Sequence, residues 1–131
     1  MEKKDDLFRA AVASREFARA EYSDFKVGAA LLSRSGKISA GCNVESASFG
    51  LTCCAERVAL FKALSEGEKD FIAVAVTAAV PNGPMPCGAC RQLLAEYAPA
   101  AVLYSFDSRA PEKSRTFLVE ELLPEAFLSF A

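Results

Sequence analysis

Apolar positions recur with different spacings along the first third of the chain, and each spacing predicts an element. In residues 5–20 apolar residues recur every three or four positions, which predicts an α-helix that buries one face, capped by Asp5 or Asp6. In residues 25–33 apolar side chains alternate along the chain, and residues 37–43 follow after a polar turn that contains glycine. This pair of segments predicts a β-hairpin.

The remainder of the chain alternates between strand and helix patterns. Residues 71–80 form a nearly continuous apolar run, which is typical of a strand covered on both faces. The further expected elements are helices over residues 53–66, 88–97 and 120–130 and strands over residues 101–106 and 115–119. This order predicts an α/β protein with one mixed, five-stranded sheet, organised as a single domain over residues 1–131. In such a sheet a ligand site lies where strands end and helices begin.

Composition narrows the classes of function. The chain has 131 residues, of which 52% are apolar, and it carries a net charge of -2 with a pI of about 5.2. This balance argues against nucleic acid as a partner, because nucleic-acid binders present basic patches. No apolar stretch approaches the ~20 residues of a membrane span, and the charged N-terminus lacks the apolar region of a secretory signal. We therefore expect a cytoplasmic protein with no membrane partner.

The cysteine and histidine counts restrict the chemistry. The chain has five cysteines, an odd number, which in a reducing compartment favours metal binding or catalysis over disulfides. It has no histidine. A histidine general base and histidine metal ligands are therefore excluded. A metal ion would be held by thiolates or carboxylates, and protons would be moved by Glu, Asp, Lys, Tyr or Cys.

Two cysteine clusters carry the candidate chemistry, each at the expected start of a helix. One contains Cys53 and Cys54, and the other contains Cys87 and Cys90, which are one helical turn apart. Helix N-termini stabilise thiolates. Cys54, Cys87 and Cys90 would give a zinc ion three protein ligands and leave one position open, which is the arrangement of catalytic zinc. One Zn²⁺ per chain is therefore the expected cofactor.

Glu56 is the candidate proton carrier. An open position on zinc would hold a water molecule that the metal acidifies, and Glu56 follows Cys54 by two residues, beside the metal without ligating it. A ligand-x-Glu segment followed by Pro-Cys-x-x-Cys is typical of zinc deaminases. Three thiolates on a divalent ion leave excess negative charge. Arg57 or Arg91 could offset this charge by hydrogen bonding to sulfur, and we favour Arg57.

Three segments together resemble the small, homotetrameric cytidine deaminases of pyrimidine salvage. They are Gly41-Cys42-Asn43-Val44-Glu45, Cys54-Ala55-Glu56-Arg57 and Pro86-Cys87-Gly88-Ala89-Cys90-Arg91-Gln92. The similarity extends from Tyr22 to Pro124. It implies a three-layer fold with helices on both faces of the sheet. It also implies hydrolysis of cytidine and deoxycytidine to uridine and deoxyuridine with release of ammonia.

The resemblance also implies substrate contacts, residue by residue. Asn43 and Glu45 match the pair that binds the ribose 3'-hydroxyl, and Phe25 matches an aromatic residue that packs near the pyrimidine. Ala55, together with Cys87, matches backbone groups that contact the edge of the base. Phe127 matches an aromatic residue that closes the site of a neighbouring subunit. One departure is Phe49, because the family usually has tyrosine at that position.

Alternatives remain open at this point. A structural zinc site would need a fourth protein ligand, which Cys53 could supply, although Cys42 and Cys53 fit better as small buried hydrophobic residues. The enzyme could deaminate another small amine, such as an aminopyrimidine antibiotic, or a base in nucleic acid. The chain could also be a zinc-stabilised binding module without activity.

Overall fold

A five-stranded mixed sheet forms the middle layer of the structure, a computed structural model in which residues 3–129 are described. Its strands are β1 (Val27–Ser33), β2 (Ile38–Cys42), β3 (Phe71–Ala78), β4 (Val102–Asp107) and β5 (Arg115–Leu118). They lie in the order β2-β1-β3-β4-β5. Neighbours are antiparallel except β3 and β4, which are parallel. The expected mixed sheet is therefore confirmed.

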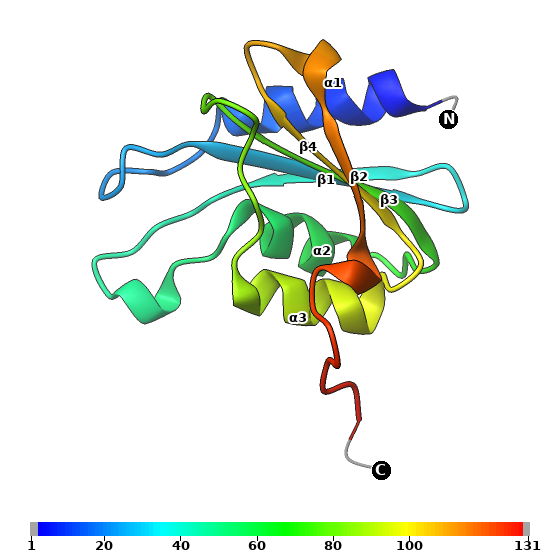
Figure 1. Cartoon of the computed structure of the whole chain (residues 1–131). Coiled ribbons are helices and arrows are strands. Elements are labelled where there is room, and N and C mark those ends of the chain that lie inside the picture. Colours follow the sequence, from blue (N-terminus) through cyan, green and yellow to red (C-terminus); the bar gives the residue numbers. More distant parts are fainter. Residues whose placement is uncertain (1–2, 130–131) are drawn as a thin grey trace.

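Among the described residues, three α-helices cover the two faces of this sheet. They are α1 (Lys4–Arg15), α2 (Ala55–Ser65) and α3 (Gly88–Tyr97). Helix α1 lies on one face, and α2 and α3 lie side by side on the other, so the molecule has three layers (Figure 1). The expectation of helices on both faces is confirmed.

The core divides into two clusters, one on each face of the sheet. Strand β1 shows why: Ala30 and Leu32 pack in the cluster with α1, whereas Ala29 and Leu31 pack in the cluster with α2 and α3. All seven residues of β1 are buried. Because both faces of a central strand are covered, it needs apolar side chains at successive positions rather than at every second one.

Helix α1 is shorter than the sequence pattern predicts. It begins at Lys4, and Asp5 and Asp6 lie in its first turn rather than capping it. It ends at Arg15 instead of continuing to residue 20, because the chain turns there to pair with the segment after β2. Arg19 N–H donates to the Asn43 carbonyl at 2.9 Å. This backbone pairing overrides the local helical pattern.

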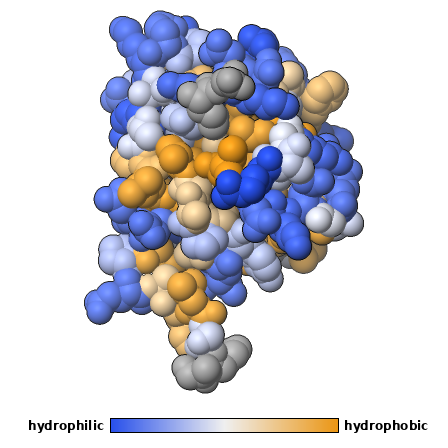
Figure 2. All heavy atoms as spheres, turned by 90° about the vertical axis from the view of Figure 1, so that its right-hand side faces the viewer, coloured by the Kyte–Doolittle hydropathy of each residue, from blue (hydrophilic) through white to orange (hydrophobic). Residues whose placement is uncertain are grey.

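The expected C-terminal helix over residues 120–130 is wrong within the described part of the chain, and residue 130 lies outside it. A 3-10 turn, η3 (Val119–Glu121), is followed by a tail without regular structure. Pro124 has no backbone N–H to donate, and Glu125 has a φ of 53°, outside the helical range. Apolar side chains therefore remain exposed along this tail, as Figure 2 shows above its grey end.

Within residues 3–129, no helix has both the length and the apolar character that a bilayer crossing requires.

Candidate active site

The first turns of α2 and α3 bring three cysteines together. Cys54 is the N-cap residue of α2, Cys87 is the N-cap residue of α3, and Cys90 lies in the first turn of α3. The Cys54 and Cys87 Sγ atoms are 3.8 Å apart, and the Cys87 and Cys90 Sγ atoms are 3.5 Å apart. All three Sγ atoms lie within 4.8 Å of one another. The two predicted cysteine clusters thus form one site.

This geometry fits a zinc ion. Thiolates that share one tetrahedral zinc, with Zn–S bonds of ~2.3 Å, have their sulfurs about 3.8 Å apart. Cys54, Cys87 and Cys90 are the group among the described residues that could hold a metal ion, and Cys53 does not belong to it. The donor set is therefore three thiolates with room for a fourth, non-protein ligand, as in catalytic rather than structural zinc sites.

Hydrogen bonds distinguish the thiols of Cys54 and Cys90. The bond with Cys90, and after it the bond with Arg57, lower the pKa of Cys54 well below the usual range of a thiol. The bond with Cys54 and then burial raise the pKa of Cys90. Of these two thiols, Cys54 therefore forms a thiolate more readily. Burial raises the pKa of Cys53, so the adjacent thiol stays neutral.

Arg57 contacts the cysteine cluster, and Arg91 does not. An Arg57 terminal nitrogen lies 3.6 Å from the Cys54 sulfur and also donates to the Thr52 carbonyl at 3.3 Å. Arg57 Nε is buried and has no hydrogen-bond partner among the described residues. Arg91 instead donates to the backbone carbonyls of Pro86 and Leu122. The contacts therefore favour Arg57 for balancing the charge of the thiolates.

Glu56 lies beside the cluster in the first turn of α2. Its side chain is buried, with 5% of the residue exposed. Burial, reinforced by the charge of Cys54, raises the pKa of Glu56 to about 7, while its own backbone N–H and Arg57 act in the opposite direction. A carboxyl group with a pKa near neutrality both accepts and returns a proton at working pH.

A cavity of about 280 Å³ opens in front of Glu56 and the cysteines. Its lining residues are Ser23, Phe25, Val27, Asn43, Glu45, Thr52, Cys54, Ala55, Glu56, Pro84, Met85 and Cys87. The lining brings together Phe25, Asn43, Glu45 and Ala55, all of which were proposed from the sequence. Cys90 lies behind this surface and is fully buried.

Asn43 holds part of the cavity lining in shape. Its Oδ1 accepts from the Val27 N–H at 2.9 Å, and its Nδ2 donates to the Phe25 carbonyl at 2.9 Å and to Glu45 at 3.2 Å. Both amide hydrogens are thus engaged, and one Oδ1 lone pair remains. Asn43 therefore fixes Phe25 and Glu45 relative to each other.

Glu45, bonded to Asn43, is a charged acceptor in the same lining. Its carboxylate accepts from the Ser23 hydroxyl and from the backbone N–H groups of Tyr22 and Ser23, both at 3.0 Å. These bonds, the Ser23 hydroxyl first, lower the pKa of Glu45. With the Asn43 amide these donors occupy all four acceptor sites of the carboxylate, so a hydroxyl of a ligand would bind Glu45 by replacing or sharing one of them.

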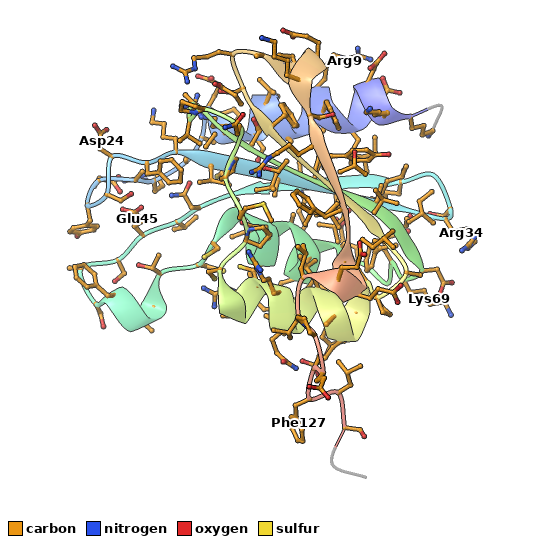
Figure 3. All side chains as sticks on the ribbon, viewed as in Figure 1. Arg9, Asp24, Arg34, Glu45, Lys69 and Phe127 are labelled. Atoms are coloured by element: carbon orange, nitrogen blue, oxygen red, sulfur yellow. The ribbon has the colours of Figure 1, made fainter. Side chains whose placement is uncertain are left out.

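Phe49 and Phe127 lie outside this cavity. Phe49 is 76% exposed in the short turn η1 (Phe49–Leu51), and its ring meets Tyr22 edge to face at 6.4 Å. It lines a second cavity that adjoins the first at Ser23, Glu45 and Thr52. Phe127 lies on the C-terminal tail, far from Glu45 (Figure 3).

The sequence did not single out five lining residues: Ser23, Val27, Thr52, Pro84 and Met85. A partial signal existed for the last two, because they directly precede the Pro86-Cys87 pair. Ser23 and Thr52 are small polar residues in loops, and only the folded backbone brings them to the cavity.

The fold and the site together define a class: zinc-binding α/β proteins in which a cysteine cluster and a buried glutamate meet at two helix N-termini. Residues 1–106 match the family model described as "Cytidine and deoxycytidylate deaminase zinc-binding region". The chain belongs to this family.

Individual relatives agree. The chain is 49% identical to a cytidine deaminase of Halalkalibacterium halodurans over 92% of this chain and 91% of the relative. A crystal structure of cytidine deaminase from Burkholderia pseudomallei is 45% identical and superposes with a TM-score of 0.89, covering 94% of this chain and 98% of that one. A blasticidin-S deaminase of Bacillus cereus is 32% identical over 79% of each chain.

Proposed function

We propose that this protein is a cytidine deaminase, which hydrolyses cytidine and deoxycytidine to uridine and deoxyuridine with release of ammonia. The observation that carries the proposal is the lining of the cavity. Glu56 and two cysteines of the thiolate cluster line the same cavity as Asn43 and Glu45. A nucleoside fits this lining, because its base carries the amine to be removed and its sugar carries the hydroxyls to be held.

Cys54, Cys87 and Cys90 would hold the zinc ion, and a zinc ion in such a site supplies a water molecule acidified toward neutral pH. Glu56 accepts one proton from water and delivers it to the ring nitrogen of the base. It then takes the second proton from the hydroxyl that has been added to the ring carbon and delivers it to the amine, which leaves as ammonia while the carbonyl forms. Its burial supports this cycle, because the pKa near 7 leaves both protonation states accessible. Arg57 offsets the negative charge of the thiolates.

The remaining lining residues orient the nucleoside. Glu45 accepts a hydrogen bond from the ribose 3'-hydroxyl, which replaces or shares one of its four present donors, and Asn43 offers its free Oδ1 lone pair. Phe25 packs near the pyrimidine ring. The backbone groups of Ala55 and Cys87 bind the edge of the base. These roles are supported by the positions of the residues around one cavity.

A free nucleoside is favoured over a nucleotide or a nucleic acid. The family includes deoxycytidylate deaminases, and a phosphate group would need cationic donors such as Arg or Lys. Among the described residues that line the cavity there is no lysine or arginine, and Glu45 is an anion at the sugar end. Phosphorylated substrates would therefore be repelled.

We also propose a homotetramer in the cytoplasm, serving pyrimidine salvage, in which Phe127 closes the site of a neighbouring subunit. The exposed Phe127 ring, 62% accessible in the isolated chain, is compatible with such a contact.

The test is direct. Purified protein with cytidine should show the absorbance change of uridine formation and release one ammonia per uridine, and a zinc chelator should abolish both. Deoxycytidine should react similarly, and cytidine monophosphate should react at least tenfold more slowly. Blasticidin S serves as the rival substrate because a blasticidin-S deaminase is among the relatives. If blasticidin S reacts and cytidine does not, the enzyme is an antibiotic deaminase; zinc without either reaction indicates a binding module.

A further inference from the structure

Residues 81–86 form one wall of the active site although they have little regular structure of their own. They run from the end of β3 to the start of α3 (Figure 1) and contribute Pro84 and Met85 to the cavity lining just before Cys87. Half of this loop is proline, and proline has no N–H for backbone hydrogen bonding. The shape of the wall must therefore be fixed from outside the loop.

Three side chains from three different elements fix alternate carbonyls of this loop. The pairs are Arg115 Nε to Asn82 O at 2.9 Å, Ser105 Oγ to Pro84 O, and Arg91 Nε to Pro86 O at 2.8 Å. The donors come from β5, β4 and α3, respectively. Ser105 and Arg115 are moreover paired residues on neighbouring strands, so their two bonds form one continuous support.

The loop is also pressed directly against β4. Gly83 has a φ of +79°, and a Cβ atom built on it would lie 2.5 Å from the Phe106 nitrogen and 2.6 Å from the Ser105 hydroxyl. No side chain larger than hydrogen fits there unless the loop moves away from β4. Ser105 is fully buried. Its hydroxyl is therefore committed to this contact and is not available to solvent.

We infer that Ser105, with Arg115 and Arg91, positions the substrate-binding wall formed by residues 81–86. None of these three side chains lines the cavity among the described residues. They act through Pro84 and Met85, so they are positioning residues. The inference rests on the proposed function, because it assigns these residues to binding of the same nucleoside.

A glycine pair tests the inference. Gly83→Ala forces the loop off β4, whereas Gly67→Ala introduces alanine at a similar φ of +86° with no atom within 4 Å of the new Cβ. Both variants bear the strain of a left-handed alanine. Only Gly83→Ala should raise the KM for cytidine, by about tenfold or more, with a smaller change in kcat and unchanged zinc content.

A hydroxyl pair tests the role of Ser105 itself with less risk to folding. Ser105→Ala removes the bond to Pro84, whereas Thr77→Val removes an equally buried hydroxyl that donates to the Phe106 carbonyl at 2.8 Å and does not contact the loop. Both should lower the melting temperature to a similar extent. Only Ser105→Ala should raise KM, by about 2- to 12-fold, the range expected for one net hydrogen bond.

Amide hydrogen exchange distinguishes a failure of the positioning role from a failure of the proposed function. Amides in residues 82–88 should exchange faster in Gly83→Ala and Ser105→Ala than in their controls, whether or not cytidine is the substrate. If wild-type protein does not deaminate cytidine, the proposed function is wrong, and exchange alone decides the positioning role. If wild type is active but each test variant has the KM of its control, or if loop exchange is unchanged, the positioning role is refuted.

Discussion

The N-termini of α2 and α3 both carry zinc ligands, yet their surroundings differ. The start of α2 contributes one cysteine and, directly after it, the buried Glu56 and the thiolate-bound Arg57. The start of α3 contributes two cysteines, one of them exposed, and its arginine binds backbone carbonyls instead. The α2 end thus holds the groups proposed to move protons and balance charge, whereas the α3 end supplies two of the three metal-binding cysteines and adjoins the wall formed by residues 81–86.

A cysteine at a helix N-terminus is thus accompanied by different neighbours at α2 and at α3. Both ends place a cysteine at the N-cap of a helix, where the helix dipole favours negative charge. At α2 the residues that follow the cysteine turn toward the cluster, and at α3 the corresponding arginine secures the loop that precedes it. Substitutions at the two ends should therefore fail in different ways, and the following expectations run from the largest effect to the smallest.

Loss of one zinc ligand should abolish deamination, whether the cysteine lies at the start of α2 or of α3. Cys87→Ala, like Cys54→Ala and Cys90→Ala, leaves two thiolates for the metal, and zinc content and deamination should both fall to background. Metal analysis of the purified variants checks this. Cys42→Ala and Cys53→Ala are the controls and should keep about one zinc per chain; full zinc in Cys87→Ala would contradict the three-thiolate site.

Loss of the proton carrier at the α2 end should reduce turnover without loss of zinc. Glu56→Gln keeps the size and burial of the side chain but cannot accept a proton. Turnover should fall by about 10²–10⁴-fold, while zinc content, fold and cytidine binding persist. Steady-state kinetics, metal analysis and calorimetric binding test this together. A variant within a few-fold of wild type would show that another group moves the protons.

The two arginines should give opposite phenotypes. Arg57→Ala removes the donor to the Cys54 thiolate, so zinc affinity should fall by about 10–100-fold, as for other residues that support metal ligands. Arg91→Ala should leave zinc affinity within a few-fold and instead raise the KM for cytidine, because Arg91 holds the Pro86 carbonyl. Competition with a chelator measures the affinity. If Arg91→Ala loses zinc and Arg57→Ala does not, the assignment is reversed.

The sequence predicted what depends on local spacing and on chemistry. Patterns of a few residues are enough to predict which strands are buried, which three cysteines form the cluster and where Glu56 lies. The end of α1 was missed because Arg19 pairs with a segment more than twenty residues away. The C-terminal helix was predicted because apolar residues recur in that segment, but Pro124 and the backbone at Glu125 prevent it.

Parts of the cavity were beyond the reach of sequence patterns. Ser23 and Thr52 become lining residues only because Glu45, Asn43 and the turn after α1 fold around one point. The support of the 81–86 wall by β4 and β5 is equally non-local. Spacing identifies groups that share a helix turn, whereas contacts between distant loops depend on how the sheet is assembled.

The smallest expected effect concerns Phe127, which lies on the tail beyond the α3 end (Figure 3). If its ring closes a neighbouring site, Phe127→Ala should raise the KM for cytidine by about 2- to 12-fold, the range for an aromatic contact, while the tetrameric mass and zinc content remain. Leu128→Ala is the matched control, because Leu128 is the next residue on the same tail and is similarly exposed, at 55% against 62%. Equal KM values in the two variants would remove the closing role. A fully active monomer in solution would contradict shared sites altogether, because a tail so far from Glu45 in its own chain reaches a nucleoside only across a subunit contact.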